Sequence, residues 1–319
     1  MKGAVPFQLS LPTENQSLFS DPSQFYMYTI RNFEGKTSYP WTAGQYGFVR
    51  NQKRTAEGML MSRFHEGIDI RPIRRDGNKV PLDLVYSMAS GKVVYTNGTS
   101  SHSSYGRYVV VEHSFEEASL YSLSAHLADI RVTSGQAVTT KTALGKLGYS
   151  GVGLDRTRAH VHVELNLLIN RKFPEWHDRN YSSPNYHGIY NGLNLIGLDI
   201  ARALKDSRKG PLSLASLLHS TPVEYRVVTP NRGTPDILRR YPALRKEKGS
   251  SHSWEIEFSP SGIPQSFRPS SQRESKPRVT WFRTKSAYHH YRTRGRMKSS
   301  GSGVILTDSG LRYLELLCQ

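Results

Sequence analysis

The sequence predicts a mainly β protein, with an antiparallel β core, an aromatic-rich N-terminal extension and a smaller α+β module at the C-terminus. From about residue 64 to 170, short runs of β-branched and aromatic residues are separated by turn formers, with no helical spacing of apolar residues between them. Aromatic residues gather before residue 50, and basic residues gather after residue 200. We therefore expect three parts, over residues 1–50, 51–190 and 195–319.

The N-terminal extension combines aromatic residues with turn formers. The runs at 25–28 (Phe-Tyr-Met-Tyr) and 39–41 (Tyr-Pro-Trp) are too apolar for a disordered tail. We expect residues 1–50 to pack against the core that follows.

The core is predicted to consist of short strands joined by turns. Five runs have the composition of strands, and a sixth has a turn at its centre. The strands are expected at 85–89, 92–95, 108–113, 119–123 and 160–165, and the turn within 132–138. A succession of strands without intervening helices favours antiparallel pairing.

The C-terminal part mixes helical and extended patterns. Apolar residues at 196, 200 and 204 keep a helical interval, which predicts a helix over 195–204. Turn-forming and charged residues predict loops at 176–190 and 245–278. The remaining expectations are helices at 212–218 and 311–317, the latter with an N-cap at 307–309, and a strand at 223–228.

The net charge of +17 is unevenly distributed. Residues 1–200 hold 21 Lys+Arg against 17 Asp+Glu, and residues 201–319 hold 22 against 9. This surplus suggests a polyanionic neighbour for the C-terminal module: an anionic polymer of the cell envelope, anionic lipid or nucleic acid. A plain solubilising surface is the alternative. Basic residues are also mixed with aromatic ones over 281–296, a pattern that can bind nucleic acid by charge and stacking or a glycan through its aromatic rings. Between these partners we place an envelope polymer ahead of nucleic acid.

Cysteine content and hydropathy argue against an internal disulfide and against a membrane-spanning segment. The single cysteine, Cys318, has no partner for an internal disulfide and is expected to be inert. No apolar run approaches the roughly 20 residues that span a bilayer, so we expect no integral membrane segment. No secretory signal is visible in the first ten residues, which leaves the location open.

Two clusters of metal-binding residue types stand far apart in the chain. The run 65–69 (His-Glu-Gly-Ile-Asp) brings a histidine and a carboxylate four residues apart, and Gly67 lets the chain turn or bulge between them. In His160-Val161-His162 both imidazoles project from the same face of a strand. One of them can bind metal while the other handles protons, and the residues alone do not say which. Two histidines and one carboxylate leave a tetrahedral zinc ion with one open position, as in catalytic sites.

Amide hydrolysis at such a site also needs groups beside the metal. Zinc lowers the pKa of a bound water to about 7. Side chains must then polarise the carbonyl, stabilise the oxyanion and move the proton. His126 and whichever histidine of the 160–162 pair does not bind the metal are available for this work. Each histidine alone is more often structural, so the joint presence of the clusters and their glycines makes the case.

Residues 64–167 resemble the lysostaphin-type, LytM-like zinc endopeptidases, which cut peptide cross-bridges in bacterial peptidoglycan. Five segments follow the order of the family's motifs. They are 64–70 (FHEGIDI), 89–94 (ASGKVV), 124–127 (SAHL), 132–138 (VTSGQAV) and 144–164, which ends in HVHVE.

The resemblance implies a role for each candidate residue. His65, Asp69 and His162 correspond to the ligands of one zinc ion. His126 and His160 correspond to the histidines that orient or deprotonate the water and stabilise the tetrahedral intermediate. The implied activity is hydrolysis of peptidoglycan cross-links by attack of a metal-bound water, in the periplasm or outside the cell.

The match departs from the family's pattern at three places. Ser124 stands where a tyrosine is usual, 155–159 (Asp-Arg-Thr-Arg-Ala) replaces a small-residue and proline approach, and 105–108 lacks a common asparagine. These changes bear on substrate preference. Two alternatives to the enzyme stay open: an inactive or regulatory relative that binds the wall, and a basic nucleic-acid-binding protein.

Overall fold

The computed structural model of the chain describes residues 7–55, 58–249, 252–283 and 294–319. These residues form two compact units. The first contains the chain up to Phe48 together with His65–Leu167 and Gly197–Ser213. The second contains Val49–Phe64, Leu168–Ile196 and Leu214–Gln319. The three parts expected from the sequence, residues 1–50, 51–190 and 195–319, stay a prediction.

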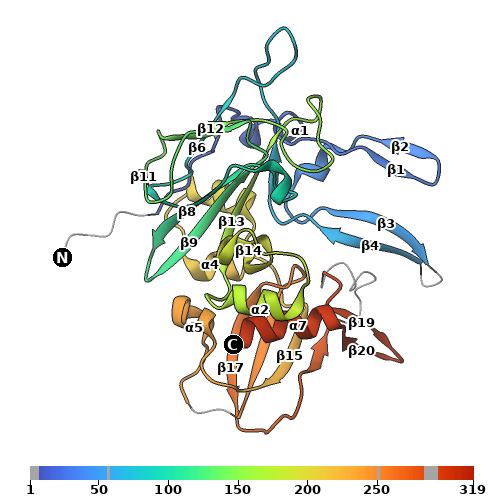
Figure 1. The fold of residues 1–319 in the computed structure, drawn as a ribbon. Helices are drawn as coiled ribbons and strands as arrows, with labels where there is room; N and C mark the ends of the chain where they lie inside the picture. The colour runs from blue at the N-terminus through green and yellow to red at the C-terminus, as the bar shows by residue number, and fades with distance from the viewer. Residues whose placement is uncertain (1–6, 56–57, 250–251, 284–293) are drawn as a thin grey trace. The chain divides into compact units, whose positions relative to one another are not determined.

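Most strands of a seven-stranded sheet form the centre of the first unit, as the sequence predicts (Figure 1). Its order is β11-β7-β8-β9-β13-β14, and β5 pairs with β13 beside this path. The pairings β11–β7, β7–β8, β8–β9, β9–β13 and β13–β5 are all antiparallel. The strands are β5 (Ile68–Ile70), β7 (Gly91–Asn97), β8 (Tyr108–Phe115), β9 (Ala118–Ala125), β11 (Ala137–Val138), β13 (Val161–Leu168) and β14 (Leu195–Gly197). The antiparallel β core is therefore confirmed.

A smaller antiparallel sheet of the order β10-β12-β6 also belongs to this unit. It is made of β6 (Leu84–Tyr86), β10 (Asp129–Ile130) and β12 (Ala143–Lys146). The turn predicted within 132–138 is also confirmed, because Gly135 turns the chain with φ of +92° just before β11.

Strand β13 is buried along its whole length. Because side chains alternate across a strand, Val161, Val163 and Leu165 face one side while His162 and Glu164 face the other. A buried polar side chain costs free energy unless it is hydrogen-bonded. This polar face of β13 therefore needs partners, and it marks where a functional site lies.

The N-terminal residues hold the strand that carries Asp69. The backbone N–H of Met27 donates to the carbonyl of Asp69 at 2.8 Å, and the N–H of Arg71 donates to the carbonyl of Phe25 at 3.0 Å. This segment therefore extends the hydrogen bonding of β5 on the side away from β13. The other elements before residue 48 are η1 (Ser17–Phe19), α1 (Pro22–Phe25), β1 (Arg31–Phe33), β2 (Lys36–Ser38) and η2 (Trp41–Gly44), and η3 (Ser100–His102) lies later in the unit.

The helix predicted over 195–204 is correct only in its second half. Leu195–Gly197 is strand β14, and the helix α3 spans Ile200–Ser207. Asp199 caps α3, because its side chain accepts the backbone N–H of Arg202 at 3.0 Å. Apolar residues recur at 196, 200 and 204 because both the strand and the helix are buried. Their spacing alone therefore could not show where β14 ends and α3 begins.

The second unit is an α+β arrangement around the antiparallel sheet β17-β16-β15-β18. Its strands are β15 (Tyr225–Pro230), β16 (Ser253–Phe258), β17 (Pro264–Ser270) and β18 (Arg278–Phe282). The loop predicted over 245–278 is therefore wrong where β16 and β17 lie. Trp254, Ile256 and Phe258 alternate with the half-buried Glu255 and Glu257, and this strand signal is obscured by the surrounding Ser and Pro.

Two hairpins and several helices complete the second unit. The hairpins are β3 (Val49–Thr55) with β4 (Gly58–Phe64), and β19 (Met297–Ser300) with β20 (Gly303–Leu306). The helices are α2 (Phe173–Asn180), α4 (Leu214–Leu218), α5 (Asp236–Arg240) and α7 (Asp308–Cys318), with 3-10 turns η4 (Gly188–Tyr190), η5 (Gly192–Asn194) and η6 (Pro242–Leu244). The loop predicted over 176–190 is wrong at its start, where α2 runs to Asn180. Pro174 does not prevent this helix, because proline is well tolerated in the first turn. Helix α7 is confirmed, and Thr307 caps it by accepting the N–H of Gly310.

Three other predictions, on membrane segments, on the basic and aromatic cluster and on Cys318, have different outcomes. No helix among the described residues is long and apolar enough to cross a membrane. Most of the basic and aromatic cluster predicted over 281–296 lies at 284–293, outside the described residues. Cys318 is buried at the end of α7, and burial raises the pKa of its thiol to about 12, which agrees with an inert cysteine.

Candidate metal centre

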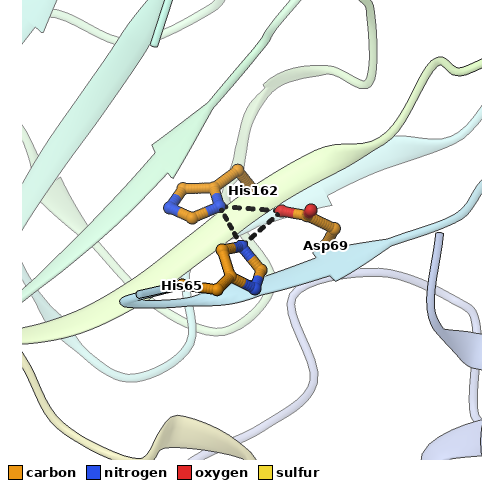
Figure 2. Close-up of side chains that lie close together, drawn as sticks. All are labelled: His65, Asp69 and His162. Carbon is orange, nitrogen blue, oxygen red and sulfur yellow. Dashed lines mark hydrogen bonds and ion pairs between the residues drawn. The ribbon is translucent and has the colours of Figure 1, made fainter. Parts of the chain in front are cut away.

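Three metal-binding atoms converge between β5 and β13 (Figure 2). His65 Nε2 lies 3.0 Å from Asp69 Oδ1 and 3.2 Å from His162 Nδ1. His162 Nδ1 lies 2.8 Å from the same oxygen of Asp69. All three residues are buried, with exposed fractions of 7, 4 and 7% for His65, Asp69 and His162.

The register of the two strands brings these groups together. Asp69 lies directly opposite His162 in the β5–β13 pair, so the two side chains share a face. His65 precedes β5, and its backbone N–H and carbonyl bond to Phe48 and Gly47. Residues 47–48 therefore anchor the main chain of His65.

Gly67 is required for the close approach of the two chain segments. A Cβ atom at this position would lie 2.4 Å from the carbonyl oxygen of Val163 and 2.8 Å from Cε1 of His162. The sequence suggested that Gly67 provides a turn or bulge, whereas the structure shows a steric reason for the glycine.

Replacement of Gly67 by alanine is expected to destabilise the first unit by about 2–3 kcal/mol, because the Val163 carbonyl belongs to a packed strand and cannot move freely. Gly77→Ala is the matched control, since a Cβ there meets nothing within 4 Å. The check is the urea midpoint of unfolding of the two variants. Equal midpoints would contradict the steric role of Gly67.

Hydrogen bonds on the far side of each imidazole determine which nitrogen faces the cluster. His65 Nδ1–H donates to the backbone carbonyl of Gln45 at 2.8 Å, and His162 Nε2–H donates to Glu164 Oε1 at 2.8 Å. The opposite nitrogens, His65 Nε2 and His162 Nδ1, then carry lone pairs that point at Asp69 Oδ1. Three acceptors this close repel one another unless a cation lies between them.

The donor set fits zinc. Neutral imidazole nitrogen and carboxylate oxygen are ordinary zinc ligands, and a histidine ligand usually donates its other N–H to a carboxylate or carbonyl. Both features are present for His65 and His162. The assignment of these three residues as ligands remains a proposal.

The charges around the centre favour an ionised carboxylate. Burial alone would raise the pKa of Asp69, but the charges of His65 and His160 and hydrogen bonds from His160 and His162 hold it well below the usual range. Burial lowers the pKa of His162, while hydrogen bonds and charge from Asp69 and Glu164 raise it to about 10. When no metal ion is bound, His162 is therefore protonated near pH 7, and its positive charge compensates the negative charge of the buried carboxylates.

Glu164 connects the centre to a second group of residues that sequence reasoning missed. Its Oε1 accepts from His162 and from the hydroxyl of Tyr105 at 2.7 Å, and its Oε2 accepts from Asn166 at 3.0 Å. The position of Glu164 could have been found from sequence, since it lies two residues after His162 on the same strand face. Tyr105 had no such signal, because it comes from a distant loop.

We expect Glu164→Gln to weaken zinc binding about 10–100-fold, since loss of the negative charge leaves His162 less firmly oriented and less basic. Glu112→Gln is the control, because Glu112 on β8 also accepts from a tyrosine hydroxyl, that of Tyr121. Competition with a chelator measures zinc affinity in both variants. If both bind zinc as tightly as the parent chain, the orienting role of Glu164 is wrong.

The two remaining candidate histidines lie beside the cluster. His160 Nε2 is 3.5 Å from Asp69 Oδ1. The His126 ring centroid is 4.9 Å from that of His160 and 5.9 Å from that of His162. The structure therefore brings all five sequence-predicted residues together.

His126 and His160 share one hydrogen-bonding pattern. His126 Nδ1–H donates to the carbonyl of Ser150 at 2.8 Å, and His160 Nδ1–H donates to the carbonyl of Arg158 at 2.7 Å. Each neutral ring then keeps a lone pair on Nε2. Burial, followed by the charges of His160 and His162, lowers the pKa of His126 well below its usual value. His126 is therefore neutral near pH 7.

The backbone at His126 is held in an uncommon conformation. Its φ is +63°, which costs a non-glycine residue of order 1 kcal/mol. The N–H groups of His126 and Leu127 donate to the carbonyls of Tyr105 and Arg107 at 2.9 and 3.1 Å. These bonds hold the turn that directs the imidazole toward the centre.

The departures from the family's pattern leave this geometry in place. Ser124 lies opposite Val163, so its side chain is on the face of the sheet away from His162. The loop at 155–159 supplies the Arg158 carbonyl that anchors His160, and Asp155 steadies this loop by accepting the Arg158 N–H at 2.9 Å.

Comparison with known proteins agrees with the site. Peptidase family M23 matches residues 63–173, about a third of the chain. A search among curated proteins gives no significant match.

Solved structures with similar parts include three peptidases. A variant catalytic domain of the prophage-encoded M23 protein EnpA from Enterococcus faecalis is 25% identical, covering 39% of this chain and 86% of its own, with a TM-score of 0.27. A zinc-containing peptidase from Vibrio cholerae is 18% identical over 50% of this chain and 37% of its own, with a TM-score of 0.28. The catalytic domain of lysostaphin from Staphylococcus simulans is 17% identical over 39% and 80%, with a TM-score of 0.27. The family match includes every residue of the cluster, and residues 63–173 of this chain are a peptidase family M23 domain.

Proposed function

We propose that this domain is a zinc-dependent endopeptidase that hydrolyses peptide cross-links in bacterial peptidoglycan. The observation that carries the proposal is the convergence of lone pairs from His65, Asp69 and His162 on one point, beside two further histidines. A structural zinc site would use a fourth protein ligand, and the cluster within the described residues has three.

His65, Asp69 and His162 would hold the zinc ion. When bound, zinc supplies Lewis-acid activation of water and of the scissile carbonyl at neutral pH. The surrounding residues keep the ligands in place: the Gln45 carbonyl and Glu164 orient the two imidazoles.

His126 and His160 would manage the protons of the reaction. Each has its Nδ1–H tied to a backbone carbonyl, which leaves Nε2 to accept a proton from the attacking water or to donate one to the leaving amine. A protonated imidazole at either position would also stabilise the negative charge that develops on the carbonyl oxygen. The proposed mechanism thus uses one residue set for the metal and another for protons.

The proposed substrate and location follow from the family. Peptidoglycan peptides lie in the cell envelope, so we propose that the protein acts in the periplasm or outside the cell. The surplus of positive charge after residue 200 suits binding to an anionic envelope polymer, which we include as a proposed partner of the second unit.

Mass spectrometry of muropeptides released from purified sacculi tests both activity and choice of bond. The zinc-loaded chain is expected to release products with new amino termini, and the His160→Ala chain is expected to release almost none. A zinc-loaded parent chain that binds sacculi without cutting them would instead assign a wall-binding or regulatory function.

A further inference from the structure

Tyr105 contacts both groups of residues at the centre, although it is not among the five residues predicted from the sequence. Its hydroxyl donates to Glu164 Oε1 at 2.7 Å, and the same oxygen accepts the Nε2–H of His162 at 2.8 Å. Its backbone carbonyl accepts the N–H of His126 at 2.9 Å. Tyr105 therefore lies where the proposed zinc ligands meet the proposed proton-handling histidines.

Neighbouring aromatic rings hold the side chain of Tyr105. Its ring centroid lies 5.6 Å from that of His162, with 31° between the ring planes, and 5.5 Å from that of Tyr108. Tyr108 is fully buried in β8, so it provides a fixed support. A side chain that is packed in this way keeps one rotamer, and its hydroxyl then points in one direction.

The loop that carries Tyr105 is tied to its surroundings. Ser103 closes a turn, since its carbonyl accepts the N–H of Gly106 at 2.9 Å and its hydroxyl accepts the N–H of Tyr105 at 3.1 Å. The Asn97 side chain donates to the Gly106 carbonyl at 2.7 Å. Gly106 has φ of +63°, and a Cβ atom there would lie 2.5 Å from the carbonyl oxygen of Ser150. These contacts fix the position from which Tyr105 reaches the centre.

The hydroxyl of Tyr105 acts on Glu164 as a hydrogen-bond donor. Burial, followed by the charges of Glu164 and Glu66, raises the pKa of Tyr105 well above its usual value, so the phenol keeps its proton. Glu164 is 1% exposed, and its Oε2 accepts from Asn166 at 3.0 Å. Without the Tyr105 hydroxyl, Oε1 would lose one of the donors that fix the direction in which it accepts from His162.

We propose that Tyr105 is a positioning residue for the metal centre, because its hydroxyl holds the Glu164 carboxylate and, through it, the imidazole of His162. Zinc affinity depends on how well each ligand is directed before the ion arrives, and partners outside the ligand set supply that direction. The proposal rests on the proposed function, since it takes His162 as a zinc ligand, and it adds a residue that acts on this ligand through a second one.

Tyr105→Phe removes the hydroxyl and keeps the ring and the backbone carbonyl. We expect this change to weaken zinc binding by the full chain about tenfold, which is the lower end of the usual effect, because Glu164 itself remains. Tyr121→Phe is the matched control, since it removes another hydrogen bond from a tyrosine hydroxyl to a glutamate, that to Glu112 Oε1 at 3.0 Å. Competition with a chelator measures the zinc dissociation constant of both variants, and the control should bind zinc as tightly as the parent chain.

A double-mutant cycle shows whether Tyr105 acts through Glu164. In the Glu164→Gln background, Tyr105→Phe should weaken zinc binding by about twofold or less, because the carboxylate that transmits the effect is gone. The proposal would be overturned if Tyr105→Phe bound zinc as tightly as Tyr121→Phe does. A full tenfold loss in both backgrounds would overturn it as well.

Two further measurements separate positioning from stability and from activity. The urea midpoint of the metal-free variants reports any loss of folding free energy, so a lower midpoint for Tyr105→Phe with unchanged zinc affinity would mean a structural role only. Zinc binding needs no turnover. If the parent chain binds zinc but cleaves no sacculi, the endopeptidase proposal fails, while weaker binding by Tyr105→Phe still supports the positioning role. A parent chain that binds no zinc would reject both.

Discussion

A chain with His65→Ala is expected to lose its zinc and its hydrolytic activity together. His65 Nε2 is one of three lone-pair donors in the cluster, and two remaining donors make a much weaker site. Zinc content should fall from about one ion per chain to near zero, measured by elemental analysis after dialysis. Release of amino groups from sacculi should fall to the level of a buffer control.

His102→Ala is a suitable control for this experiment, because His102 is an exposed histidine of the same unit and lies outside the cluster. It should keep both zinc and activity. Retention of one zinc ion per chain by the His65→Ala protein would reject His65 as a ligand. A parent chain that stays metal-free when supplied with zinc would reject the metalloenzyme as a whole.

Replacement of His160 or His126 by alanine should lower turnover by about 10²–10⁴-fold while zinc stays bound, which is the usual contribution of a general acid or base. Neither histidine belongs to the three-residue cluster, and in each the Nδ1–H donates to a backbone carbonyl, which leaves Nε2 for the proton. Steady-state kinetics on a defined cross-linked peptide, with zinc analysis of the same samples, checks both statements.

The comparison of the two variants adds a second test. If both lost zinc, the division between metal ligands and proton-handling histidines would be wrong. If one variant kept full activity, that histidine would be a neighbour of the site without a part in the reaction. His102→Ala again serves as the reference for a histidine change with no expected effect.

Much of the candidate site could be predicted from sequence because its members stand in short, regular spacings. The pair His160 and His162 share a face in any strand, and His65 stands four residues before Asp69. Each spacing alone is a weak signal, and their joint presence with the flanking glycines made the prediction. Their meeting across distant segments followed from resemblance to a family, and the β5–β13 register now gives it a structural basis.

Other parts of the site left no mark in the sequence. The Gln45, Ser150 and Arg158 groups that orient three of the histidines are backbone carbonyls, which every residue possesses. The fold shows similar limits: the apolar interval at 196–204 ran across a strand and a helix, and strand alternation at 254–258 was hidden among Ser and Pro.

By itself, the sequence determined the residue types of the site, the antiparallel β core and the uneven distribution of charge. Only the tertiary structure decided which nitrogen of each imidazole faces the centre and why position 67 is glycine. The physical reason is that hydrogen-bond direction and steric contact depend on atoms from segments far apart in the chain, such as Glu164 and Tyr105 or Gly67 and Val163. Spacing along one segment carries no information about such partners.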